Sequence, residues 1–243
     1  MAIIGRHGIT ENTPKNVLLG AGTIHKNLHF VPTTYALTTD QSVVQGKKYY
    51  TRSGTSPNYK YDEVLSPAVG SISTYYECTL GHWEGDVIGA TSGGNKVTLK
   101  GEIFNIELDG AFVNVKGLAV KQGGTAQIEV NYGELSPNIL KIVSLYKESA
   151  SDAPGYKMYV DKATIDEGDY IKNFGFVGKT ANDAKDIIVI MENALCTSGL
   201  ELEGKQGSGT VIKATMEAYA ELDENSTLDI LPVKIYYPDD SNE

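Results

Sequence analysis

The sequence contains little cysteine, little tryptophan and no long hydrophobic run. Cys78 and Cys196 are the two cysteines among 243 residues, too few and too far apart for a disulfide framework. We therefore expect two buried free thiols. No window approaches the length of a membrane-spanning segment, and residues 1–16 lack the apolar core of a signal peptide. These absences predict a protein without a membrane segment that stays in the cytosol where it is made until release.

Basic residues are also in deficit. The chain has 21 lysines and arginines against 31 aspartates and glutamates, a formal net charge of −10. Such a balance argues against a surface that grips phosphates. It is compatible with a surface that DNA slides past, because an acidic wall repels the duplex whereas a basic wall holds it.

Motifs for catalysis are missing as well. The sequence has no Walker-type loop, dinucleotide fingerprint, nucleophile elbow or paired-cysteine metal spacing. His25 and His29 are four residues apart, which suits a metal site on a helix, but they lie in a strand-like segment where they do not converge. We expect no enzymatic activity, no metal site and no cofactor.

Alternating apolar and polar residues dominate what is present. They run from Val97 to Ile103, and the phase then changes at Ile103 and Phe104, which predicts an extra residue there, as in a β-bulge. The pair at 109–110 is Asp-Gly, a strong hairpin signal. We expect a return strand through 113–115 and a third strand over 126–132.

Further elements follow in order. Ser136 and Pro137 are typical of a helix start, and Ile139, Leu140, Val143 and Tyr146 fall on one helical face. The apolar run 187–191 predicts a central strand. Residues 200–222 predict a long hairpin that turns at 207–209, with Ile212, Ala214, Met216, Ala218, Ala220 and Leu222 on one face. A closing strand is expected over 233–237. The pattern is mainly β with one α-helix packed on the sheet.

Residues 33–79 differ in composition, being dense in tyrosine, serine and threonine. They predict a small β module, and two interpretations of its tyrosines remain. Tyrosines are ordinary strand formers in a module too small for an aliphatic core. They are also the residues that carbohydrate- and protein-binding loops use. The candidates for surface binding are Tyr49, Tyr50, Tyr59, Tyr61, Tyr75 and Tyr76.

Three runs together resemble a known family. They are KNVLLGAGTIHKNL, the stretch GATSGGNKVTLKGEIFNIELDGAFVNVKGLAVKQGGTAQIEVNYGELSPNILKIV, and ENALCTSGLELEGKQGSGTVIKATMEAYAELDENSTLDILPVKIYYP. This order of glycines, alternating strands and one helix resembles the major tail tube protein of long-tailed (siphovirus-type) bacteriophages. The tyrosine-rich segment resembles a short repeat of phage tail proteins.

The resemblance implies a β-sandwich or barrel fold with one helix. The N-terminal arm and first strands would span 1–32, an outward-facing inserted module 33–79, and the main tube domain 80–243. It also implies homo-hexameric rings that stack helically into a tube in the virion tail, assembled in the host bacterial cytoplasm. The partners would be the tape measure, tail terminator and tip proteins, with viral DNA passing through the lumen without specific binding.

A tube of this kind needs a polar strand face toward its lumen. The candidates are Glu102, Glu107, Gln127, Glu129, Asn131, Thr215, Glu217 and Glu221. Alternation defines the two faces of a strand without saying which one looks inward, so solvated outer positions are an equally good interpretation of these residues. The alternative function is a carbohydrate- or protein-binding β-sandwich module of a phage tail or cell surface.

Overall fold

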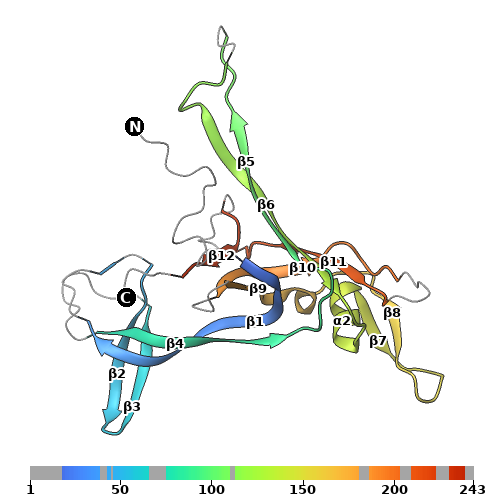
Figure 1. Cartoon of the computed structure of the whole chain (residues 1–243), viewed down its shortest axis with the longest axis horizontal. Coiled ribbons are helices and arrows are strands. Elements are labelled where there is room, and N and C mark those ends of the chain that lie inside the picture. Colours follow the sequence, from blue (N-terminus) through green and yellow to red (C-terminus); the bar gives the residue numbers. More distant parts are fainter. Residues whose placement is uncertain are drawn as a thin grey trace. The chain divides into compact units, whose positions relative to one another are not determined.

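The computed structural model of the chain describes residues 18–38, 43–44, 46–65, 75–109, 113–180, 186–202, 209–222 and 230–238. The expected N-terminal arm and the predicted turn residues Gly110, Gly207 and Ser208 lie outside these ranges. The described chain is mainly β with one α-helix and a large antiparallel sheet, which confirms the predicted fold class (Figure 1). No helix within the described ranges combines the length and the apolar character that crossing a bilayer requires.

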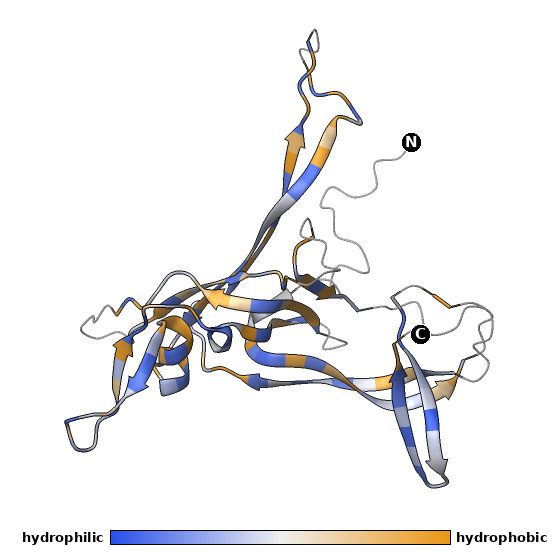
Figure 2. Ribbon diagram, turned by 180° about the vertical axis from the view of Figure 1, so that it is seen from behind, coloured by the Kyte–Doolittle hydropathy of each residue, from blue (hydrophilic) through white to orange (hydrophobic). Residues whose placement is uncertain are grey.

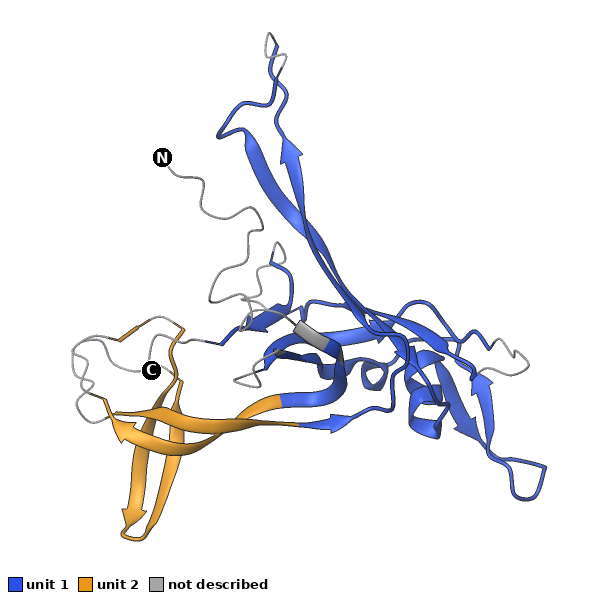
Figure 3. Ribbon diagram, viewed as in Figure 1, with its two compact units in different colours: residues 1–28, 85–243 blue, residues 29–84 orange. Residues whose placement is uncertain are grey.

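The chain divides into two compact units (Figure 3). Unit 1 comprises residues 1–28 and 85–243, and unit 2 comprises residues 29–84. The segment expected to form the tyrosine-rich module, 33–79, lies within unit 2. Two long strands, β1 (Leu18–Leu37) and β4 (Tyr76–Val87), contribute residues to both units.

Unit 1 contains most of the elements. Its strands are β5 (Lys96–Asn105), β6 (Ala119–Tyr132), β7 (Tyr146–Ser149), β8 (Met158–Asp161), β9 (Ile171–Thr180), β10 (Ile187–Cys196), β11 (Ile212–Ala218) and β12 (Val233–Tyr236). Its helices are α2 (Pro137–Val143) and a 3₁₀ turn at Glu167–Asp169. The sheet order is β1-β9-β10-β11-β6-β5, with β12 also paired to β10 and with β7 and β8 forming a separate pair.

The core of unit 1 lies on one face of this sheet. Alternation along β6 buries Ile128, Val130 and Tyr132, and alternation along β11 buries Ile212, Ala214 and Met216, as predicted. Strand β10 is apolar on both faces through Ile188–Met191, as expected of a central strand.

Helix α2 covers part of this core. The Ser136 hydroxyl accepts a hydrogen bond from the Ile139 amide at 3.2 Å, and Pro137 takes the first helical position, as the sequence predicted. Ile139 and Val143 are buried in the core. Tyr146 was expected to continue the helical face, but the helix ends at Val143 and Tyr146 begins β7. Ser144 caps the helix, and its amide and hydroxyl both donate to the Leu140 carbonyl oxygen.

Two strand predictions were wrong. The expected return strand through Val113 and Val115 does not form; β6 instead begins at Ala119 and runs without interruption to Tyr132. In the last part of the chain, β11 pairs with β10 and β6 and not with residues 200–202, and it ends at Ala218. Leu222 is therefore 81% exposed, because it lies past the end of the strand whose alternation it had been expected to continue.

Unit 2 is built on four strand segments. Strand β2 (Tyr49–Thr55) pairs along its length with β3 (Asn58–Val64), and the order continues through β4 to β1. Tyr49 is fully buried, with its ring 6.1 Å from that of Tyr75.

Cys78 and Cys196 are free, but only Cys196 is buried; Cys78 is half-buried, so the prediction of two buried thiols was wrong for it.

Candidate functional site

The hairpin of β5 and β6 reaches beyond the core of unit 1 (Figure 1). We define the arm as residues 99–109 and 113–125. Strand β6 is alternately buried from Ala126 to Tyr132, but from Ala119 to Thr125 it is largely exposed. Figure 2 shows hydrophobic residues on both strands of the arm. The arm therefore carries apolar residues that unit 1 itself does not cover.

A β-bulge bends the hairpin where the arm begins. Gly101 pairs with Gly124, but Ile103 pairs with Lys121, so two steps along β5 correspond to three along β6. The bulge was predicted at this level of the hairpin, but the extra residue is on β6 and not at Ile103–Phe104. Gly124 has a φ of +153°, and a Cβ there would lie 2.3 Å from the Lys100 carbonyl oxygen. The bulge thus requires glycine at this position.

Both faces of the arm carry exposed apolar side chains. Leu99 and Ile103 lie on one side of β5, and Phe104 lies on the other, next to its cross-strand neighbour Val120. Ile103 is 69% exposed and Phe104 58% exposed. A two-stranded ribbon that is apolar on both faces has no core of its own. Burying it requires contact on both sides.

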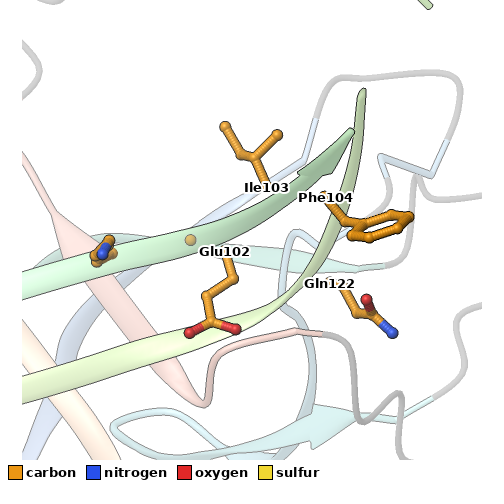
Figure 4. A pocket seen from close by; sticks show the side chains of 6 residues that line it. Glu102, Ile103, Phe104 and Gln122 are labelled. Carbon is orange, nitrogen blue, oxygen red and sulfur yellow. The ribbon is translucent and has the colours of Figure 1, made fainter. Parts of the chain in front are cut away.

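A hollow of about 470 Å³ lies beside the bulge (Figure 4). Its lining consists of Lys100, Gly101, Glu102, Ile103, Phe104 and Gln122. Glu102 and Ile103 point to opposite sides of β5 in this view. The lining thus combines two apolar side chains, Ile103 and Phe104, with the amine of Lys100, the carboxylate of Glu102 and the amide of Gln122.

Five of the predicted lumen residues lie together on one face of β6 and β11. The register pairs Lys213 with Asn131, Thr215 with Glu129, and Glu217 with Gln127, so these residues share the face opposite the core. The Gln127 amide nitrogen donates to a Glu217 carboxylate oxygen at 2.6 Å, and that of Asn131 donates to the Gly94 carbonyl oxygen at 2.7 Å. We call Gln127, Glu129, Asn131, Lys213, Thr215 and Glu217 the polar face.

The charges on this side of the sheet are balanced. Alternation along β5 adds Lys96, Lys100 and Glu102 to the lysine and the two glutamates of the polar face. Three lysines therefore accompany three glutamates, and Lys96 forms an ion pair with Glu129. The surplus of acid expected for a lumen wall is not present among these residues.

The other three lumen candidates lie outside the β6–β11 pair. Glu102 is exposed on the arm, and Glu107 is exposed in the connection after β5. Glu221 lies past the end of β11. The structure thus brings together the five candidates on the paired strands β6 and β11. Glu107 and Glu221 lie in connecting segments, where alternation does not determine the position of a side chain.

The candidate tyrosines of unit 2 divide between two faces. Tyr49 is fully buried and Tyr50 is 7% exposed, so neither offers the binding surface that was predicted. Burial also raises the pKa of the Tyr50 hydroxyl above its ordinary value, with a smaller contribution from Glu63. Tyr75 packs beside Tyr49, on the opposite face from Tyr50 and Tyr76. Tyr59, Tyr61 and Tyr76 remain at least partly exposed.

Sequence reasoning missed two residues beside these tyrosines. Arg52 is the cross-strand neighbour of Tyr61, and Tyr35 on β1 stacks on Tyr61 with ring centroids 4.0 Å apart. The alternation of β2 could have placed Arg52 on the same face as Tyr50. Nothing in the sequence indicates that Tyr35, on a distant strand, stacks there.

The histidines provide no metal centre in the described part of the chain. The two ring nitrogens of His25 have other neighbours. Nε2 lies 2.9 Å from the Thr23 hydroxyl oxygen, and Nδ1 lies 3.4 Å from the Gly85 carbonyl oxygen. No group of three histidine, cysteine, aspartate or glutamate side chains within the described ranges could hold a metal ion.

Comparison with known families and proteins adds no assignment. No protein-family model matches the chain, and no curated protein matches it in sequence.

Proposed function

We propose that the chain is the structural subunit of a phage tail tube. In this proposal, subunits form hexameric rings that stack into a conduit through which the genome passes, with the tape measure, terminator and tip proteins as further partners. The resemblance described above suggests the hexamer and the partners. The subunit would act passively, by assembling and not by turnover.

The observation that carries the proposal is the arm. Its apolar side chains face solvent on both sides of a two-stranded ribbon, and full burial of a side chain such as Ile103 or Phe104 contributes about 1.5–3 kcal/mol. Strand β5 also ends the sheet, so its outer edge has no strand partner among the described residues. Exposed edges of this kind promote pairing with other chains.

A second copy of the chain is the partner that this surface favours. If each arm packs against its neighbour around a closed rotation, the contact is heterologous and every arm is buried in a ring. The polar face would then remain available to line the lumen. Its two glutamates are matched by Lys213 and by Lys96, which is paired with Glu129, so this face would neither hold nor strongly repel DNA.

Electron microscopy of the purified protein at rising concentration tests the proposal. We expect rings or hollow filaments of uniform width. The double variant Ile103→Ser with Phe104→Ser removes apolar surface from both faces of the arm and should keep the chain monomeric. Asn105→Ser, on the same strand, is the matched control and should assemble like the wild type.

Two results would contradict the proposal. One is a wild-type protein that stays monomeric in sedimentation at every concentration tested. The other is a double variant that assembles as readily as the wild type, because the arm would then contribute nothing to the contact.

A further inference from the structure

One face of unit 2 carries a continuous group of aromatic rings. The register places Tyr50 next to Tyr76, Arg52 next to Tyr61, and Gly54 next to Tyr59. We call Tyr35, Arg52, Tyr59, Tyr61 and Tyr76 the tyrosine face. Tyr35 and Tyr61 are stacked at an interplanar angle of 8°, and Tyr61 meets Tyr76 edge-on at 5.4 Å. This packing holds the rings in fixed positions.

Arg52 lies among these rings. Its guanidinium carbon is 4.4 Å from the ring centroid of Tyr59 and 4.8 Å from that of Tyr76. Cation–π contacts of this kind hold the guanidinium through its flat faces and leave its N–H groups available. The ring contacts thus orient the Arg52 guanidinium without occupying its N–H groups.

No carboxylate within the described ranges forms an ion pair with Arg52. Glu63 shares this side of the β2–β3 pair, but its carboxylate oxygen lies 2.8 Å from Nζ of Lys48. The positive charge of Arg52 is therefore unmatched locally, in a chain whose formal net charge is −10. An exposed, oriented and unpaired guanidinium suits a carboxylate ligand, which it can bind through two parallel hydrogen bonds.

The ring of Tyr59 is accessible beside it. Tyr59 is 40% exposed, and its cross-strand neighbour Gly54 has no side chain to cover it. Gly54 has a φ of +87°, and a Cβ there would lie 2.5 Å from the Asn58 carbonyl oxygen, so the backbone itself requires glycine. A rigid aromatic ring gives contact area at low entropic cost, which suits the apolar face of a sugar.

We propose that the tyrosine face binds an acidic carbohydrate. The sugar carboxylate is held by Arg52, and the sugar ring lies against Tyr59. The ligand class is a polymer of uronic acids, which places a carboxylate and a C–H face on the same residue. This binding is separate from tube assembly, since the tyrosine face and the arm belong to different units.

Titration calorimetry with oligogalacturonate tests this inference on the full chain, using the monomeric arm variant so that assembly does not interfere. The matched ligand is the methyl-esterified oligomer, which keeps the sugar and removes the charge. We expect a dissociation constant of about 1 mM or tighter for the acid, and binding of the ester that is weaker by about tenfold or more.

Variants separate charge from geometry. Arg52→Gln should abolish the preference for the acid over the ester, and Arg52→Lys should weaken it because lysine lacks the planar fork. Lys60→Gln, a change of equal charge on the opposite face of the same hairpin, should leave binding unchanged. Circular dichroism checks that each variant is folded.

Several results would overturn the proposal. They are the absence of wild-type binding to the acid, equal binding of acid and ester, and an unchanged preference in the Arg52→Gln variant. Equal affinity for polyglutamate would also overturn it, because it would show that charge alone, and not a sugar, is recognised.

Discussion

The two halves of β6 lie on one continuous strand and yet have opposite environments. From Ala126 to Tyr132 every second residue is buried, whereas from Ala119 to Thr125 the side chains are mostly exposed. Both halves contain apolar residues. The difference arises from the partners: β11 and the core cover the second half, while only β5 accompanies the first. An apolar residue thus stabilises this strand only where a second layer covers it.

We expect the largest loss of stability from substitutions in the covered half of β6, residues 126–132. Ile128→Ala should lower the free energy of unfolding by about 2–5 kcal/mol, because it leaves a cavity beside Met216 in the core. Val120→Ala, on the uncovered half of the same strand, should change it by less than about 0.5 kcal/mol. Urea denaturation followed by circular dichroism measures both. Equal losses would show that the two halves do not differ in burial.

The second effect concerns the bulge that separates the halves. Gly124→Ala should cost about 1–3 kcal/mol, because the new Cβ would clash with the Lys100 carbonyl oxygen in a backbone conformation that disfavours side chains. Gly123→Ala is the matched control: its φ is +66° and no atom lies within 4 Å of the added Cβ. Its cost should be smaller, about 1 kcal/mol. If the control costs more than Gly124→Ala, the assigned bulge geometry is wrong.

The third expected effect on stability concerns Tyr132, a fully buried residue at the end of β6. The Tyr132 hydroxyl is buried without a hydrogen-bond partner among the described residues, so Tyr132→Phe should raise the free energy of unfolding by about 1 kcal/mol. Tyr146→Phe, at a residue 40% exposed, should have no measurable effect. A loss of stability in Tyr132→Phe would indicate a bonded hydroxyl.

The same residue gives a pH dependence. Burial raises the pKa of Tyr132 above its ordinary value of 10.0, with a smaller contribution from Cys196. Above about pH 10 the unfolded chain loses this proton while the folded chain keeps it, so the free energy of unfolding falls as pH rises. Tyr132→Phe should show a shallower fall than the wild type. Equal slopes would contradict the assigned burial.

The smallest effect on stability is expected on the arm. Ile103→Ser with Phe104→Ser should change the unfolding free energy of the monomer by no more than about 0.5 kcal/mol, since both side chains are already exposed. We expect these two substitutions to weaken the assembly of subunits instead. A loss of several kcal/mol in the monomer would mean that the arm packs against its own chain.

The polar face could be predicted in part from the sequence. Alternation placed Gln127, Glu129 and Asn131 on one side of a strand and Thr215 and Glu217 on one side of another, because side chains alternate regardless of the partner. That the two strands are neighbours, and that Lys96 neutralises Glu129, depends on pairing over long sequence distances. Glu107 and Glu221 lie past the ends of β5 and β11, where alternation does not determine which way a side chain points.

Local chemistry determined several features of this protein from the sequence alone. The mainly β class, the helix begun by Ser136 and Pro137, and the buried alternation of 126–132 and 212–216 follow from backbone periodicity and capping. Only the tertiary structure decided that β6 is one strand without a partner layer along its first half, and that Tyr35, Arg52 and Tyr61 meet on one face. Burial and cross-strand contact depend on which distant segments pair, and local periodicity does not specify that choice.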